Sequence, residues 1–149
     1  VRIAIIDDDP FVLTHLTRTF AKQLPAAEIS GVSDPIAPVG YDVYIIDREF
    51  GENRCGLDLI KRVKKLAPDS LVVAYSAFLD RDYLRNLILE PCEGAFDKGS
   101  LEELEKMVEL IRDFLDRSHS LKPRSPSPRE TVRSILELIR EWNTRLSHT

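Results

Sequence analysis

The stretch "VRIAIIDDDP", residues 1–10, decides the fold of this chain because it joins a strand to an acidic turn and a helix start. The apolar run 3–6 is typical of a strand that is buried on both faces. Asp9 followed by Pro10 is the pattern of a helix cap with proline at the first helical position. Two unit charges about 4 Å apart interact by about 4 kcal/mol at an effective dielectric near 20. Adjacent aspartates therefore need either a solvated turn or an outside partner that relieves their repulsion.

The rest of the sequence up to residue 117 alternates strands with helices. Short apolar runs predict strands over 27–32, 41–46, 71–76 and 94–97, after the first strand over 1–6. Apolar residues at helical spacing predict helices over 10–24, 57–66, 82–89 and 101–115. This alternation indicates an α/β fold, a doubly wound parallel sheet of five strands with helices on both faces. The segment "SDPIAPVG", residues 33–40, is too short and too rich in proline for a full helix, so we expect a shortened second helix or an irregular loop.

The composition changes after Arg117. We expect one domain over 1–117, a Pro- and Ser-rich linker over 118–128 and an amphipathic helix over 129–149. The helix carries a heptad seam of two repeats, formed by Val132, Ile135, Ile139, Trp142 and Leu146. Such a helix is unstable alone, so it is a dimerising coiled coil, a helix that docks onto the domain, or the first helix of an absent output domain.

The overall composition narrows the possible partners. A net charge of −4 over 149 residues argues against a nucleic-acid-binding domain. The two cysteines, Cys55 and Cys92, form no CxxC pair and lie near no histidine cluster, which fits a reducing compartment. The apolar runs are too short to span a membrane. We therefore expect a cytoplasmic protein that contacts neither nucleic acid nor membrane.

Polar residues follow the predicted strands at the points where the strands end. Asp7 and Asp8 follow the first strand, Asp47 the third, and Lys98 the fifth, while Ser76 ends the fourth. In an open parallel sheet these ends meet at one edge, where ligands bind. Clustered carboxylates suit Mg²⁺, and an aspartate can attack phosphorus. We predict Asp47, on a central strand, as the nucleophile, with the first two aspartates holding the metal and the hydroxyl and ammonium groups contacting phosphoryl oxygens.

Five stretches carry a resemblance to a known family. They are "IAIIDDDP", "YDVYIID", "CGLDLIKRVKKLAP", "LVVAYSA" and "GAFDKGSLEEL". Over residues 1–117 the chain resembles the CheY-like receiver domain of bacterial two-component response regulators. The resemblance implies a flavodoxin-like sheet with strand order 2-1-3-4-5.

The resemblance also implies a function. Asp47 would accept a phosphoryl group from a histidine kinase or phosphotransfer protein, and Ser76 and Lys98 would contact it. Mg²⁺ or Mn²⁺ would be bound by Asp7, Asp8, Asp47 and the backbone carbonyl of Glu49. The protein would be a signalling phosphoacceptor rather than an enzyme. It would form homodimers, if any, through the last receiver helix or the C-terminal helix.

Three positions depart from the family pattern. Ala95 stands where members carry an aromatic switch residue, and Phe96 follows it. The loop "REFGENRCG", residues 48–56, is one residue longer than usual, and Gly99 replaces a common proline. These departures support an alternative, an interaction module of receiver fold whose output does not depend on phosphorylation. A phosphatase is disfavoured because "DREF" lacks a second aspartate two positions after Asp47.

Overall fold

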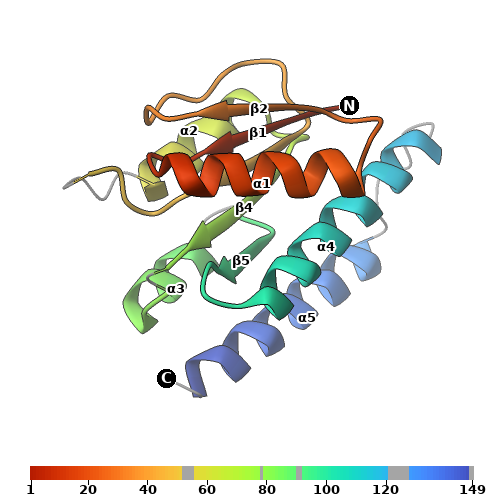
Figure 1. The fold of residues 1–149 in the computed structure, drawn as a ribbon. Coiled ribbons are helices and arrows are strands. Elements are labelled where there is room, and N and C mark those ends of the chain that lie inside the picture. Colours follow the sequence, from red (N-terminus) through yellow and green to blue (C-terminus); the bar gives the residue numbers. More distant parts are fainter. Residues whose placement is uncertain (52–55, 78, 90–91, 121–127, 148–149) are drawn as a thin grey trace.

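The protein is built on one parallel sheet. The computed structural model describes residues 1–51, 56–77, 79–89, 92–120 and 128–147. The strands lie in the order β2-β1-β3-β4-β5 (Figure 1), which confirms the predicted fold class and strand order. Their bounds are β1 (Arg2–Ile6), β2 (Glu28–Val32), β3 (Val43–Ile46), β4 (Leu71–Ser76) and β5 (Gly94–Asp97). All four strand pairings are parallel, so the carboxyl ends of all five strands lie at one edge.

Helices cover both faces of the sheet. Their bounds are α1 (Pro10–Gln23), α2 (Gly56–Leu66), α3 (Arg81–Ile88), α4 (Leu101–Ser120) and α5 (Pro128–Ser147). Successive residues of a strand point to opposite faces. Ile3 and Ile5 accordingly pack in one core with residues of α1 and α4, whereas Ala4 and Ile6 pack in the other with residues of α2 and α3. Burial on both faces explains the continuous apolar runs of the inner strands β1, β3 and β4.

The crossover between β2 and β3 contains no helical turn. Residues 33–42 run as an irregular loop, the second of the two forms expected from the sequence. Pro35 and Pro38 supply no backbone N–H, which removes two donors that a helix would need. The loop is instead held by the Tyr44 hydroxyl, which donates to the Pro38 carbonyl at 2.6 Å, and it turns at Gly40 with φ of 85°.

Two helix starts are set by aspartate caps. Asp9 accepts a hydrogen bond from the backbone N–H of Phe11 at 2.9 Å, immediately before Pro10, as the sequence predicts. Asp80 caps α3 by accepting from the N–H of Tyr83 at 2.8 Å. The helix therefore begins at Arg81, one position before the expected start.

The C-terminal helix packs against the domain. α4 continues to Ser120, beyond the predicted domain end at 117, and α5 lies beside α3 and α4 in Figure 1. Trp142 of α5 is 1% exposed and belongs to the same core as the α3 side chains. Docking onto the domain is thus the arrangement that this structure shows among the three expected from the sequence.

The predicted seam of α5 is only half buried. Trp142 and Leu146 pack against the domain, whereas Ile135 and Ile139 are 51% and 37% exposed. Leu138, which lies outside the predicted seam, packs against the core instead. The side chain of Val132 lies outside the described part of the chain. The division into domain, linker and helix remains a prediction, since residues 121–127 are not described.

Candidate functional site

Three carboxylates meet at the carboxyl edge of the sheet. The backbone N–H of Asp7 donates to the Val32 carbonyl at 3.0 Å, and that of Asp47 donates to the Ile6 carbonyl at 3.0 Å. These bonds extend the strand pairing by one residue and fix both aspartates side by side. One oxygen from each of Asp7, Asp8 and Asp47 lies within 4.8 Å of the others, close enough for one metal ion.

Lys98 closes the same edge from β5. Its backbone N–H donates to the Ser76 carbonyl at 3.1 Å, which places it directly beyond the ends of β4 and β5. Its ammonium group lies 2.5 Å from Asp7 Oδ2 and 3.2 Å from Asp47 Oδ2. The structure therefore brings the two aspartates and the lysine together around one small volume. In the absence of a metal, this ammonium group partly neutralises two carboxylates.

Two further predicted residues lie next to these groups in the sheet or in the sequence. Ser76 is fully buried at the end of β4, in register with Asp97. Glu49 is half-buried in the turn that follows Asp47. That turn is held against Asp8, because the N–H of Gly51 donates to Asp8 Oδ2 at 2.6 Å. Gly51 has a φ of 60°, which favours glycine at this position. The carbonyl of Glu49 as a metal ligand remains a prediction.

Gly56 allows α2 to begin directly against the turn after Asp47. A Cβ atom at this position would lie 2.1 Å from the Asp47 carbonyl oxygen and 2.6 Å from the Arg48 Cα. Both are backbone atoms that cannot move aside, so a residue without a side chain is required here. The N–H of Gly56 also donates to the Arg48 carbonyl at 3.0 Å. Residues 52–55, which include Cys55 and the predicted extra loop residue, lie outside the described part.

Burial makes the acidic groups difficult to ionise. Burial, followed by the negative charge of Asp7, raises the pKa of Asp47 to about 6, although Lys98 opposes the shift. Burial likewise raises the pKa of Asp7, against the hydrogen bonds from Lys98 and the Asp9 N–H. Burial lowers the pKa of Lys98, but its hydrogen bond to Asp7 and the nearby carboxylates outweigh this and leave the pKa raised. A divalent cation would favour the ionised carboxylates, so the donor set fits Mg²⁺ or Mn²⁺.

Arg48 is a residue of the site that the sequence reading missed. Its N–H donates to Asp47 Oδ1 at 2.8 Å, and its side chain is only 10% exposed. The guanidinium group pairs with Asp80 at 2.6 Å and lies 4.7 Å from the centre of the Tyr83 ring. Its position directly after the predicted nucleophile was the available signal, because a charged residue that becomes buried there needs a partner.

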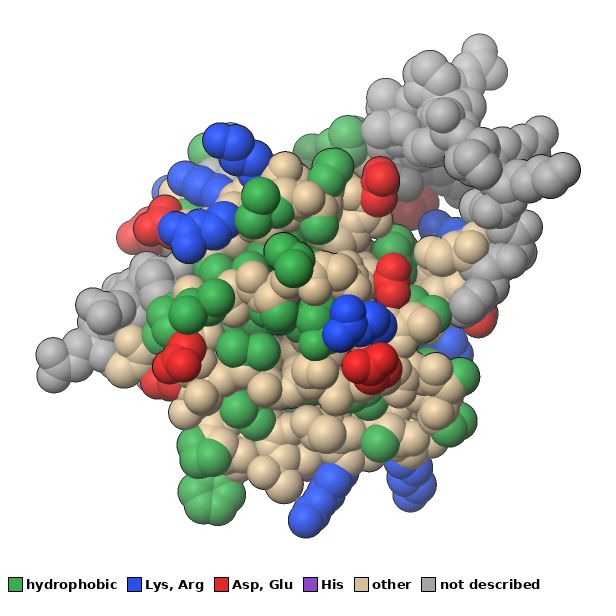
Figure 2. All heavy atoms as spheres, turned by 90° about the horizontal axis from the view of Figure 1, so that it is seen from above, with side chains coloured by type: hydrophobic (Ala, Val, Ile, Leu, Met, Phe, Trp, Pro, Cys, Tyr) green, Lys and Arg blue, Asp and Glu red, His purple; other side chains and the backbone are tan. Residues whose placement is uncertain are grey.

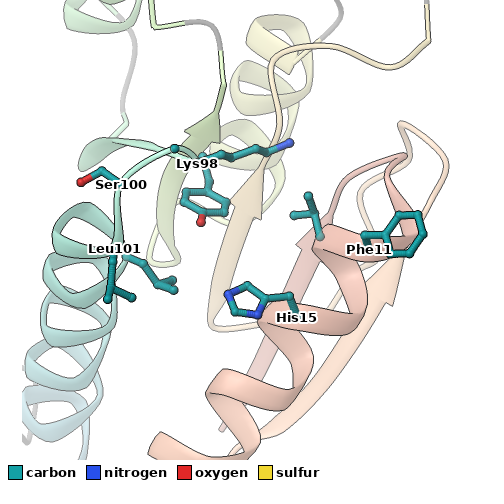
Figure 3. A pocket seen from close by; sticks show the side chains of 9 residues that line it. Phe11, His15, Lys98, Ser100 and Leu101 are labelled. Atoms are coloured by element: carbon teal, nitrogen blue, oxygen red, sulfur yellow. The ribbon is translucent and has the colours of Figure 1, made fainter.

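A pocket of about 350 Å³ lies beside Lys98, between α1 and the start of α4. Figure 3 shows Phe11 and His15 on the α1 side, with Ser100 and Leu101 on the other. Phe11 is 84% exposed and Leu101 is 71% exposed. Two large apolar side chains thus stand in solvent at the rim of the site.

The face of the molecule seen in Figure 2 carries charged side chains of both signs. Lys and Arg side chains there are interspersed with acidic and apolar ones. Within the described residues, no helix combines the length and apolar character needed to cross a bilayer.

We expect the metal-free protein to lose stability as the pH rises from about 4 to about 6. Over this range the folded protein retains a proton on Asp47 that the unfolded chain, with a pKa of 3.8, has released. The free energy of unfolding should fall by about 3 kcal/mol across the window, at about 1.4 kcal/mol per pKa unit. Urea unfolding in EDTA at several pH values measures this.

Asp47→Asn is the test variant, and Asp58→Asn, on the exposed side of α2, is the matched control. The first substitution should remove most of the pH dependence and stabilise the protein at pH 7. The control should keep the wild-type slope. An unchanged slope in Asp47→Asn would contradict the burial of an ionisable group at this position.

Comparisons with known proteins agree with this architecture. No protein-family model matches the sequence, and no curated protein sequence matches it. Solved structures do match. The signal receiver domain of a DNA-binding response regulator from Colwellia psychrerythraea has a TM-score of 0.65 at 23% identity, covering 75% of this chain and 98% of that one.

A receiver domain from Clostridium thermocellum has a TM-score of 0.67 at 18% identity, covering 80% of this chain and 97% of that one. The BeF3-activated receiver domain of DrrB has a TM-score of 0.64 at 15% identity, covering 77% and 97%. The chain therefore has the fold of the receiver domains of response regulators, as its sequence motifs predict.

Proposed function

We propose that this chain is the receiver of a two-component phosphorelay and accepts a phosphoryl group on Asp47. The observation that carries the proposal is the placement of Asp47 between an acidic pair and Lys98 at the carboxyl edge of the sheet. Receiver domains among the structural neighbours support the same function. Asp7, Asp8, Asp47 and the Glu49 carbonyl would hold Mg²⁺ or Mn²⁺.

The chemistry follows from the positions of these groups. An ionised oxygen of Asp47 attacks the phosphorus of a phosphohistidine, the P–N bond breaks, and the imidazole nitrogen keeps the electron pair and takes up a proton. A bound divalent cation would neutralise charge on the phosphoryl oxygens. Lys98, already 3.2 Å from Asp47 Oδ2, can stay with the transferred group as a fixed positive charge. The buried hydroxyl of Ser76, at the end of β4, would contact a phosphoryl oxygen.

The product is a signal rather than a released compound. The phosphoryl group stays on the protein until hydrolysis regenerates Asp47, so the chain acts as a signalling phosphoacceptor and not as an enzyme on other substrates. A histidine kinase or histidine phosphotransfer protein is the donor class that this chemistry requires.

We expect acetyl phosphate with Mg²⁺ to add one phosphoryl group to the wild-type protein, seen as a mass increase of the intact chain. Asp47→Asn should show no increase, because it lacks the nucleophile. Lys98→Ala should slow the modification at least tenfold, because it removes the cation beside Asp47.

Lys106→Ala is the matched control, since it removes an exposed lysine from the same part of the chain. It should be modified at the wild-type rate. Equal modification of Asp47→Asn and wild type would refute the proposed phosphoacceptor.

The donor has to reach a carboxylate that is only 7% exposed. It must therefore cover the rim of the site, where Phe11 and Leu101 stand in solvent beside the pocket of Figure 3. Exposed apolar side chains next to a reactive group are typical of a protein-binding surface. We infer that the donor protein docks on these two residues.

Phe11→Ala should slow phosphotransfer from a histidine kinase or phosphotransfer protein at least fivefold, while leaving the rate with acetyl phosphate unchanged. The small donor needs no docking surface, so the two rates separate docking from chemistry. Leu66→Ala is the control, because Leu66 is 64% exposed at the far end of α2. An equal loss in Phe11→Ala with both donors would overturn the docking role.

A second candidate is an interaction module whose output ignores phosphorylation. Ala95 favours it, because this buried position contributes only a methyl group to the core beside α3. Under this alternative, phosphorylation by acetyl phosphate would leave the oligomeric state of the protein unchanged. Light scattering before and after modification distinguishes it from a phosphorylation-dependent receiver.

A further inference from the structure

The helix α5 covers the side of the sheet that ends in β5. Trp142 is almost completely buried in the core that also contains Ala95 of β5 and the α3 residues Leu84 and Leu87. The small side chain of Ala95 leaves this part of the core without bulk of its own. A residue from outside the sheet, Trp142, supplies the large side chain on this side of β5.

The last turn of α5 is fixed by polar contacts to both neighbouring helices. Arg145 pairs with Glu103 in the first turn of α4 at 2.9 Å, and both side chains are 17% exposed. The same guanidinium lies 5.4 Å from the centre of the Phe96 ring of β5. On the other side, Arg81 of α3 donates to the Leu146 carbonyl at 3.3 Å. The face formed by α3, β5 and α4 thus holds an amphipathic helix by one indole and two arginines.

These contacts lie a few residues from the acidic site. Glu103 and Phe96 flank Lys98 in the sequence, and Lys98 contacts Asp47. Arg81 directly follows Asp80, which pairs with Arg48, the residue after Asp47. Two routes that combine these contacts with neighbouring positions of the chain therefore lead from Asp47 to the last turn of α5, one by way of α4 and one by way of α3.

We propose that α5 is an intramolecular ligand of the α3–β5–α4 face, and that a phosphoryl group on Asp47 weakens its binding through Arg48. This proposal rests on the phosphoacceptor function proposed above. Because the helix that binds this face belongs to the same chain, phosphorylation would release α5 from the face rather than recruit a separate partner to it.

The direction of the effect follows from the charges. An aspartyl phosphate carries about two negative charges and several acceptor oxygens, where the carboxylate carries one. Arg48, whose backbone already contacts Asp47, would be drawn from Asp80 toward the new group. Asp80 also caps α3, so losing its arginine loosens the start of the helix that bears Arg81, Leu84 and Leu87. The packing of these α3 residues around the Trp142 side chain would then loosen.

Few of the described side chains of α5 are buried against the domain. Among the described side chains of α5, Trp142 is fully buried and Leu138, Arg145 and Leu146 are partly buried, whereas Ile135, Leu136 and Ile139 are exposed. The sheet itself does not depend on α5, because apart from the described residues of this helix the cores on both faces are made by residues 1–120.

The experiment uses the fluorescence of Trp142, which is the only tryptophan of the chain. The chain of residues 1–149 is treated with acetyl phosphate and Mg²⁺, and intact mass is measured on the same sample. We expect the emission maximum to shift to longer wavelength and acrylamide quenching to increase at least twofold as the phosphorylated fraction rises.

Two variants test the route. Asp80→Asn keeps an oxygen that can cap α3 but removes the charge that pairs with Arg48. It should show increased quenching before phosphorylation and little further change after it. Glu103→Gln should also increase basal quenching, whereas Glu102→Gln, the exposed neighbour on the same turn, should behave as wild type.

The outcomes separate the two proposals. Phosphorylation seen by mass, with no change in Trp142 emission or with reduced quenching, overturns the release of α5 and leaves the phosphoacceptor function intact. No phosphorylation by mass overturns the function and, with it, this proposal. A wild-type response in Asp80→Asn overturns the role of Arg48.

Discussion

Like charge at the carboxyl edge of the sheet is the constraint on which the other features of this protein depend. The strand pairing of β1 with β3 fixes Asp7 and Asp47 side by side, and the backbone of Gly51 fixes Asp8 beside them. The sheet can tolerate this cluster because Lys98 reaches across from β5. A single ammonium group still leaves the cluster negative, which would favour a divalent cation and, under the proposed function, a phosphoryl group bound with it.

The parts of this arrangement that are local in sequence could be predicted from it. Continuous apolar runs that end in Asp7, Asp47 and Lys98 define both the parallel sheet and the edge where ligands bind. The helix cap at Asp9 and the crossover after β2, which prolines keep from forming a helix, can likewise be predicted from a few neighbouring residues. These features depend on backbone chemistry that the residue type alone determines.

The parts that depend on long-range packing could not be predicted. The pairing of Arg48 with Asp80 joins residues that are 32 positions apart, and no local pattern indicates it. Of the predicted seam of α5, Trp142 and Leu146 pack against the domain, but Ile135 and Ile139 do not, and Leu138 packs there in their place. A heptad pattern identifies an apolar face, whereas the surface it meets decides which side chains are buried.

The docked α5 bears on how the proposed receiver function would produce an output. Ala95 of β5 has no aromatic side chain that could move when Asp47 is modified. Trp142 of α5 supplies a large aromatic side chain to the same core. Arg48 links the site to the N-cap of α3 through Asp80, and Lys98 lies three residues before the start of α4, whose Glu103 pairs with Arg145 of α5. Under the proposed function, the large side chain of the switch and the charges that would act on it come from different segments of the chain.

The central claim, that repulsion among Asp7, Asp8 and Asp47 prepares a cation site, is tested most directly by Mg²⁺ titration of the metal-free protein with thermal unfolding as the readout. At a hundredfold excess over the dissociation constant, a ligand of the folded state stabilises by about 2.7 kcal/mol. The melting temperature should then rise by about 5–10 °C in the wild type. Asp8→Asn should require much more Mg²⁺ for the same rise, whereas Glu102→Gln should titrate as wild type. A melting temperature that does not respond to millimolar Mg²⁺, or that responds equally in Asp8→Asn, would contradict the cation site.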